Sequence, residues 1–258
     1  MNDKNKISVV INTYNAELHL RKVLESAKGF DEILICDMES TDQTLKIAHE
    51  MGCRIVTFPK KDYVSAEPAR TFAIQSASYY WVLVIDADEI ITPELHDYLY
   101  QRIQEEKCPS GLFIPRLNKF MGKYTKSISY DHQLRFFQRE GTTWPPYVHT
   151  FPSVKGATDK IPANLKNVRI IHLADETISD LLRKTNSYTD GEIQKRPNRK
   201  GGIFLLFIRP AWRFFRTYIL KLGFLDGKPG LVKAGMDALY QYVLIAKIIE
   251  KENKERAL

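Results

Sequence analysis

The stretch Trp81-Val-Leu-Val-Ile-Asp-Ala-Asp-Glu89 decides the fold of this chain. Its apolar run, rich in β-branched residues, is typical of a fully buried strand. The run ends in two carboxylates, Asp86 and Asp88, separated by one alanine. Open α/β sheets bind ligands at the carboxyl ends of their strands, so this position favours a ligand site. Paired carboxylates suit Mg²⁺ or Mn²⁺, which in turn bind phosphate oxygens. The alternative is a strand followed by an acidic turn.

The first hundred residues alternate strand and helix patterns. Asn15 lies near the start of the first helical pattern, Ser40 and Gln43 resemble a capping box, and Thr92-Pro93 supplies a cap and an N1 proline. Alternating strands and helices predict a parallel sheet with right-handed crossovers. We expect strands over 7–11, 32–36, 54–58 and 81–85, and helices over 16–27, 40–51, 67–77 and 92–106.

The regular alternation of strand and helix patterns ends after Cys108-Pro-Ser-Gly111, where long loops separate the expected elements. Asn198–Gly202 reads as a hinge. We therefore expect an α/β domain over residues 1–200 and a helical C-terminal region over 201–258. The later expected elements are strands over 111–116, 133–138 and 168–172, and helices over 177–192, 203–222 and 232–249.

The bulk composition indicates a folded protein of ordinary character. The chain has 258 residues, of which 44% are hydrophobic and 27% charged. Three cysteines without metal-type pairing fit a reduced, cytoplasmic setting. We expect neither a signal peptide nor a transmembrane helix, since the N-terminus lacks a signal-like pattern and no apolar run reaches about 18 residues.

Polar residues follow three separate strand patterns. The first strand leads into Thr13-Tyr14-Asn15 with Glu17 just beyond, the second ends at Asp37, and the fourth ends at Asp86. This is the pattern expected when several loops jointly build a nucleotide pocket. The chain has neither a Gly-x-Gly-x-x-Gly fingerprint nor a Walker A loop.

Three of these fragments carry a family resemblance. Ile7-Ser-Val-Val-Ile-Asn-Thr-Tyr-Asn-Ala-Glu17, Asp37-Met-Glu-Ser-Thr-Asp42 and Asp86-Ala-Asp88 resemble the successive signatures of family 2 glycosyltransferases of GT-A fold, a Rossmann-like, mostly parallel sheet flanked by helices. The later part is similar to bacterial enzymes of the lipopolysaccharide-core β-glucosyltransferase type. The fragments that carry this second resemblance are Leu134-Arg-Phe-Phe137, Val148-His149 and Gly223-Phe-Leu-Asp-Gly-Lys-Pro-Gly230.

The resemblance implies roles for the matching residues. Asp37 would contact the uracil or ribose, and Arg70 would lie near the pyrophosphate. Asp86 and Asp88 would bind the metal, Mg²⁺ or Mn²⁺, and the ribose, with Asp88 the firmer metal ligand. Such a cation would stabilise charge on the departing nucleoside diphosphate. The remaining nucleotide-sugar contacts would be Thr13, Tyr14, Asn15 and Glu17.

Inversion at the anomeric carbon also requires a base beside the acceptor hydroxyl. The family places an acidic residue shortly before an arginine-containing strand, and Asp131 occupies that place, although Tyr130 replaces the first member of the usual Glu-Asp pair. His132 is a rival base, because histidine titrates near neutrality. His149 and His172 are each candidates for a further metal ligand or a phosphate contact, and we assign His149 to the metal.

The basic charge is concentrated near the C-terminus. Residues 195–256 carry 14 Lys/Arg and five Asp/Glu, whereas the rest of the chain is close to neutral. Within 203–222, Arg209, Arg213 and Arg216 share a helical face among aromatic residues. A basic, aromatic-rich amphipathic helix predicts contact with an anionic membrane surface. The alternative is a helix that packs its apolar face on the rest of the protein.

We therefore expect a metal-dependent, inverting glycosyltransferase. It would move a sugar, most simply from a UDP-hexose, to a cell-envelope glycan or lipid-linked acceptor at the inner face of the cytoplasmic membrane. One alternative is a nucleotidyltransferase, against which the missing Gly-rich phosphate loop counts. Another is a non-catalytic protein whose basic tail binds an anionic surface such as nucleic acid, which leaves Asp37, Asp86 and Asp88 unexplained.

Overall fold

The structure, a computed structural model, describes residues 3–63, 65–124, 131–146, 150–162, 164–196 and 198–256. It divides the chain into two compact units, each of two segments. The sheet unit consists of Met1–Leu117 and Asp131–Leu173, and the helical unit of Asn118–Tyr130 and Ala174–Leu258. In the later part of the chain, the boundary between the two compact units lies at residues 173 and 174. The expected boundary between the catalytic domain and the C-terminal region, at residues 200 and 201, stays a prediction.

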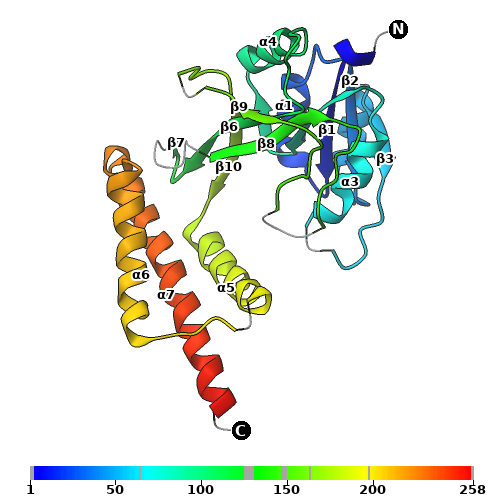
Figure 1. Ribbon diagram of the computed structural model, residues 1–258. Coiled ribbons are helices and arrows are strands. Elements are labelled where there is room, and N and C mark those ends of the chain that lie inside the picture. Colours follow the sequence, from blue (N-terminus) through cyan, green and yellow to red (C-terminus); the bar gives the residue numbers. More distant parts are fainter. Residues whose placement is uncertain are drawn as a thin grey trace. The chain divides into compact units, whose positions relative to one another are not determined.

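Ten strands within the described residues form one sheet in the order β3-β2-β1-β4-β8-β6-β10-β5, with β7 and β9 paired to β6 (Figure 1). The neighbours among β1, β2, β3 and β4 are parallel, whereas β8 runs antiparallel to β4 and to β6. The strands are β1 (Ile7–Thr13), β2 (Glu32–Asp37), β3 (Arg54–Thr57), β4 (Trp81–Asp86), β5 (Glu89–Ile91), β6 (Gly111–Phe120), β7 (Lys123–Tyr124), β8 (Asp131–Gln138), β9 (Thr158–Lys160) and β10 (Ile170–Glu176).

Helices cover both faces of the parallel strands. On one face, α1, α2 and α4 pack their apolar side chains against alternate residues of β1 and β4, such as Val9 and Leu83. On the other face, α3 packs against the residues between them, such as Val10 and Val84. These helices are α1 (Glu17–Ser26), α2 (Thr44–Glu50), α3 (Glu67–Ser76) and α4 (Pro93–Arg102). The buried strand patterns explain this arrangement, and the predicted α/β fold is confirmed.

The helix starts were predicted with mixed success. Thr92 caps α4 as expected, since its hydroxyl accepts from the Leu95 backbone N–H and Pro93 follows. The predicted capping box at Ser40 is wrong, because α2 begins only at Thr44 and the Ser40 hydroxyl donates to Asp37 instead. The Ser40 side chain is therefore used to order the loop after β2.

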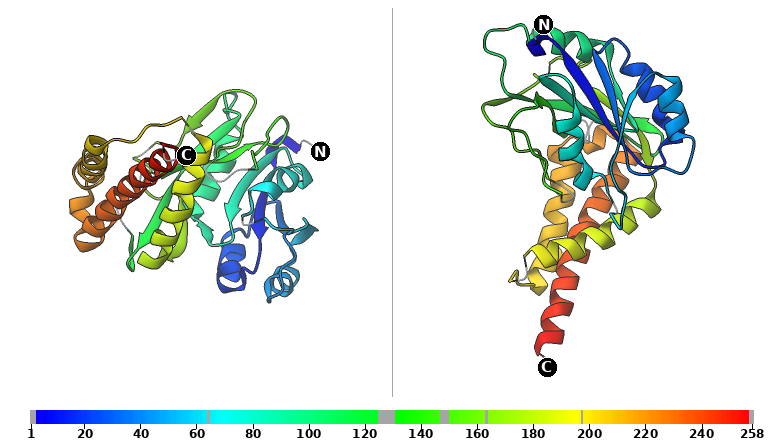
Figure 2. Two further views of the ribbon diagram at one scale, coloured as in Figure 1. Left: turned by 90° about the horizontal axis from the view of Figure 1, so that it is seen from below. Right: turned by 90° about the vertical axis from the view of Figure 1, so that its right-hand side faces the viewer.

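The helical unit is built around α5 (Ile178–Lys195), α6 (Ile203–Phe215) and α7 (Lys228–Arg256). Figure 2 shows α6 and α7 side by side. A π-helical turn, η2 (Arg216–Leu220), and a short 3-10 helix, η3 (Gly223–Asp226), connect them. A further 3-10 helix, η1 (Asp3–Asn5), precedes β1. Among the helices of the described residues, none combines the length and apolar character needed to cross a membrane.

Candidate active site

The carboxyl ends of β1, β2 and β4 meet at one edge of the sheet. The strand registers place Thr13 of β1 beside Asp37 of β2, and Asn12 of β1 beside Asp86 of β4. The polar residues that end three separate strand patterns are therefore neighbours in space. This is where open α/β sheets bind their ligands.

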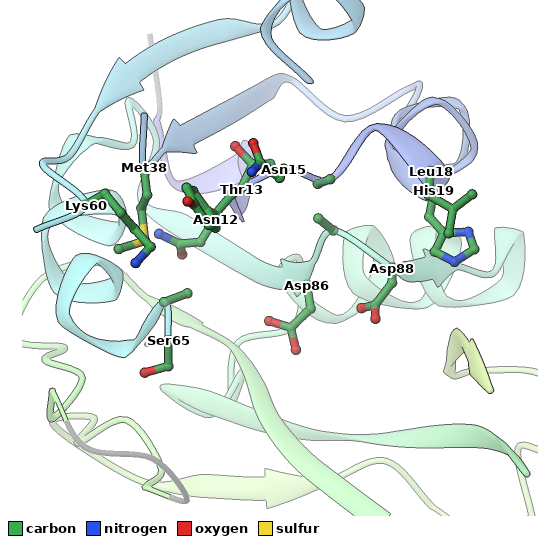
Figure 3. Close-up of a pocket in the computed structure, with 14 residues that line it drawn as sticks. Asn12, Thr13, Asn15, Leu18, His19, Met38, Lys60, Ser65, Asp86 and Asp88 are labelled. Carbon is green, nitrogen blue, oxygen red and sulfur yellow. The ribbon is translucent and has the colours of Figure 1, made fainter. Parts of the chain in front are cut away.

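A pocket of about 460 Å³ opens at this edge. Figure 3 shows the carboxylates of Asp86 and Asp88 next to each other, with Lys60 and Met38 toward one end of the pocket and His19 toward the other. Five of the predicted site residues line it, namely Thr13, Tyr14, Asn15, Asp86 and Asp88. Asn12, Ala16, Leu18, Ser65, Ala66 and Ala87 complete the wall.

Three predicted contacts, Asp37, Glu17 and Arg70, do not line this pocket. Asp37 and Glu17 instead order the loops around it. The buried Asp37 carboxylate accepts from the Thr13 hydroxyl at 2.8 Å and from the Ser40 hydroxyl and backbone N–H at 2.6 and 2.8 Å. The Glu17 carboxylate accepts from the Gln43 backbone N–H at 2.9 Å, which ties the start of α1 to that of α2.

Asn15 connects the same two loops. Its backbone has a positive φ of 49°, which asparagine tolerates better than most residues. Its side-chain oxygen accepts from the Thr41 backbone N–H at 2.8 Å, and its own backbone N–H donates to the Ser40 hydroxyl at 2.9 Å. The turn that presents Tyr14 to the pocket is therefore fixed from the neighbouring loop.

Two arginines engage the Asp86 carboxylate. Arg70 of α3 donates to Oδ1 at 2.6 Å, and Arg135 of β8 donates to Oδ2 at 2.7 Å. Burial alone would raise the pKa of Asp86, but the charges of Arg135 and Arg70 outweigh it and hold the pKa well below its usual range. Asp86 is therefore ionised at neutral pH. Both guanidinium groups also lie over the Trp144 ring.

Glu89 contacts both Asp86 and Arg135 from within the sheet. It is fully buried, and its Oε2 accepts from the Asp86 backbone N–H at 2.8 Å. Its Oε1 lies 3.2 Å from Arg116 and 3.5 Å from Arg135. The carboxylate of Glu89 therefore offsets the positive charge of Arg116 and Arg135.

The second carboxylate, Asp88, has a histidine partner. His172 lies opposite Glu89 where β10 pairs antiparallel with β5, and its Nε2 is 3.2 Å from Oδ2 of Asp88. Burial would lower the pKa of His172, yet the hydrogen bond and charge of Asp88 raise it above its ordinary value. An oxygen and a nitrogen that both bind divalent cations are thus brought together.

Asp131, the predicted base, begins β8. Because β8 runs antiparallel to β4, pairing Gln138 with Trp81, its first residue lies toward the carboxyl end of β4. Its backbone is paired with Arg116 of β6. His132, the rival base, is half-buried and follows it in the strand. The predicted metal ligand His149 lies outside the described residues.

Sequence reasoning missed several residues of the site. Arg135 was quoted only within the fragment Leu134–Phe137 and Glu89 only within the stretch Trp81–Glu89, and nothing in the sequence pairs them. Lys60, from the loop after β3, lies 4.7 Å from the Tyr14 ring centroid and donates to the Tyr63 carbonyl. Asn12 is a further missed residue, because neither atom of its buried side-chain amide has a hydrogen-bond partner among the described residues. The available signal was a polar residue near the end of a buried strand pattern.

Comparison with known proteins shows which family the chain resembles. Residues 8–160 match the family model described as glycosyl transferase family 2. An uncharacterised glycosyltransferase of Rickettsia typhi is 26% identical over 273 residues, covering 97% of this chain and 89% of that protein. The lipopolysaccharide core biosynthesis glycosyltransferase LpsC of Rhizobium meliloti is 24% identical over 256 residues, covering 95% and 92%.

A solved structure supports the fold alone. The crystal structure of S. aureus TarS 1–349 superposes with a TM-score of 0.51 at 14% identity, covering 95% of this chain and 92% of that one. The family model spans more than half of the chain, and the relatives agree with the predicted resemblance to lipopolysaccharide-core enzymes. The chain therefore belongs to glycosyl transferase family 2, and its helix-flanked, mostly parallel sheet has the predicted GT-A fold.

Proposed function

We propose that this family 2 glycosyltransferase transfers a hexose from a UDP-sugar, with inversion, to a cell-envelope glycan or a lipid-linked acceptor. The observation that carries the proposal is the grouping at the end of β4, where Asp86 is kept ionised by two arginines and Asp88 faces His172. Both carboxylates line a pocket that Thr13, Tyr14 and Asn15 also line.

A divalent cation, Mg²⁺ or Mn²⁺, fits the residues at this strand end. Asp88 supplies a carboxylate oxygen and His172 an imidazole nitrogen, and their separation of 3.2 Å lets both atoms meet one ion. The described residues contain no group of three or more His, Cys, Asp or Glu suited to a metal, so substrate phosphates and water would supply the remaining ligands. The cation would offset negative charge on the departing nucleoside diphosphate.

The nucleotide half of the donor has partners along the pocket wall. A carboxylate offers about four acceptor sites, so Asp86 can accept from a ribose hydroxyl in addition to its arginines. Arg70 does not line the pocket itself but is bonded to Asp86, which does. Its buried Nε and Nη1 atoms have no partner among the described residues, which leaves capacity for a further acceptor such as a phosphate oxygen. The Asn12 amide, which has no partner within the described part of the chain, adds a donor and an acceptor, and Lys60 adds a positive charge.

The transfer itself is a direct displacement. The acceptor hydroxyl attacks the anomeric carbon, the bond from that carbon to the diphosphate oxygen breaks, and Asp131 takes the hydroxyl proton. The position of Asp131 at the start of β8, toward the carboxyl end of β4, supports this role. Attack from the side opposite the leaving group gives inversion.

The acceptor class is inferred from the relatives. LpsC carries a name that refers to lipopolysaccharide core biosynthesis, and its alignment spans nearly the whole of both chains. A lipopolysaccharide, by its name, joins a polysaccharide to a lipid. We therefore propose an envelope glycan as acceptor and a place at the inner face of the cytoplasmic membrane.

A thermal-shift screen tests this function. We expect UDP-glucose or another UDP-hexose with Mn²⁺ to raise the Tm more than GDP- or dTDP-sugars do, since a ligand at 100 times its Kd stabilises by about 2.7 kcal/mol. NMR of the product then reports the anomeric configuration. A lack of stabilisation by any nucleotide sugar, with or without metal, would contradict the proposal.

A further inference from the structure

Helix α6 is apolar on two sides. Its inner side, including Leu205 and Leu206, packs against Leu244, Ile245 and Ile248 of α7. No residue of α6 is fully buried, however. The inner side is half-buried, and the other side is exposed to solvent. An apolar helix face normally packs against another element or a membrane.

The exposed residues of α6 form one continuous stripe. Exposed pairs recur every four residues, which keeps them on one face of the helix. Phe204 is 81% exposed, Phe207 66% and Trp212 57%, values far from those of ordinary core aromatics. The large apolar members of the stripe are Ile203, Phe204, Phe207, Ile208, Trp212 and Phe215.

The stripe continues onto the turn between α6 and α7. Ile219, Leu220, Phe224 and Leu225 are all exposed. The turn is tight, because a Cβ added at Gly230 would lie 1.9 Å from the Gly223 carbonyl oxygen. The close approach of these two glycines holds η3 against the start of α7 and leaves the side chains of Phe224 and Leu225 outward.

Basic residues are frequent in the segment that carries this apolar surface. Residues 201–233 contain six basic residues and a single acidic one, Asp226. Arg216, Lys221 and Lys228 are exposed near the turn. The three arginines keep the spacing of one helical face, and Arg213 among them is half-buried and lies 3.6 Å from Asp237 of α7. The outer face is therefore apolar, with basic residues beside it.

We propose that this surface, the outer face of α6, η2 and η3, inserts into the interface of an anionic phospholipid bilayer. Apolar side chains would enter the boundary between headgroups and acyl chains, while the adjacent basic residues meet lipid phosphates. Charge favours this occupant over a second copy of the chain, because two such basic surfaces would repel each other. The inference deepens the proposed function, on which it rests only for the lipid-linked nature of the acceptor.

Vesicle sedimentation with matched variants tests the insertion. Wild type is expected to sediment with vesicles of phosphatidylglycerol and phosphatidylcholine. Phe207→Ser/Trp212→Ser should weaken vesicle binding by about tenfold or more, because exposed apolar area is lost. The control Ile178→Ser/Leu182→Ser removes exposed apolar residues of α5 in the same unit and should bind like wild type.

Charge reversal tests the lipid chemistry. Arg216→Glu/Lys221→Glu/Lys228→Glu should release the protein from phosphatidylglycerol vesicles, and added salt should weaken wild-type binding in the same way. Lys22→Glu/Lys46→Glu/Lys166→Glu makes the same charge change on exposed residues of the sheet unit and should leave binding intact. Hydrolysis of UDP-glucose in solution, measured on every variant, reports the proposed function separately.

Several results would overturn the insertion. One is wild type that stays in the supernatant, and another is equal vesicle binding by the Phe207→Ser/Trp212→Ser variant. A dimer in analytical ultracentrifugation that this variant dissolves would assign the surface to a second copy. A large fall in its Tm would assign the surface to packing within the chain.

Discussion

The imidazole Nε2 of His172 lies 3.2 Å from Oδ2 of Asp88, although 84 positions separate the two residues in the chain. The antiparallel pairing of β10 with β5 creates this contact, since it sets His172 opposite Glu89, the residue after Asp88. The backbone reinforces it, because the Leu173 N–H donates to the Asp88 carbonyl at 2.8 Å. Two potential metal ligands are thus positioned by strand pairing rather than by a flexible loop.

The first prediction concerns this pair. Asp88→Asn and His172→Ala should each weaken Mn²⁺-dependent binding of UDP by about tenfold or more, because each removes a ligand of the proposed cation. Calorimetry with Mn²⁺ and with EDTA measures the effect. His49→Gln, on the exposed end of α2, is the control and should bind as wild type does. UDP affinity of wild type that EDTA leaves unchanged would contradict a metal at this site.

The part of the site that follows strand ends was predictable, and the part that depends on strand pairing was not. A buried strand pattern that stops at a polar residue marks a site edge, which identified Thr13, Asp37, Asp86 and Asp88. Arg135 contacts Asp86 only because β8 enters the sheet antiparallel to β4, and no local pattern encodes that neighbour. The same reason explains why His172 could be named as a candidate but not connected to Asp88.

The second prediction concerns the base. Asp131→Asn should lower kcat by about 10²-fold or more, because the acceptor hydroxyl loses its proton acceptor, while donor affinity is retained. Steady-state kinetics together with UDP binding separate the two effects. His132→Gln provides the comparison, since its neighbouring position tests the rival base. If His132→Gln loses turnover and Asp131→Asn does not, the proton acceptor is the histidine.

The third prediction concerns the buried charges. Arg135→Met should lower the free energy of unfolding by about 3 kcal/mol, because it leaves Asp86 and the fully buried Glu89 with fewer positive partners. Arg21→Met, which breaks an exposed pair with Glu50, should cost about 1 kcal/mol or less. Urea unfolding of both variants measures the difference. Equal losses would mean that Arg135 contributes no more than a surface charge.

The helical unit shows a second limit of sequence reasoning. Its helices were predicted from apolar content, and α6 does begin at Ile203 as expected. The partner of the arginine face on this helix was less predictable, because no sequence pattern pairs Arg213 with Asp237 of α7. Arg213 lies four positions after Arg209 on the same face, and its Nε is 3.6 Å from the Asp237 carboxylate.

The fourth prediction concerns pH and Glu32, at the start of β2. Burial would raise the pKa of Glu32, but hydrogen bonds from Ser8, Ser78 and Arg54 outweigh it and lower the pKa below its ordinary 4.5. The ionised carboxylate therefore stabilises the fold above pH 4.5, and this contribution is lost as the pH falls through the lowered value. Wild type should exceed Glu32→Gln in Tm at pH 7, and the gap should close at lower pH. A gap independent of pH would show that ionisation of Glu32 is not involved.

The last prediction compares two glycines of α7. Gly230→Ala should destabilise the protein by about 2 kcal/mol, because the new methyl group meets the Gly223 carbonyl oxygen, a backbone atom that cannot move alone. Gly235→Ala, in the same helix, meets nothing within 4 Å and should stabilise by about 1 kcal/mol through higher helix propensity. Urea unfolding followed by circular dichroism measures both. Opposite signs would show that the tight turn below Phe224 and Leu225 is fixed by close backbone approach. If both substitutions stabilise the protein, the turn has room for a side chain. Its glycines would then not determine the outward orientation of Phe224 and Leu225.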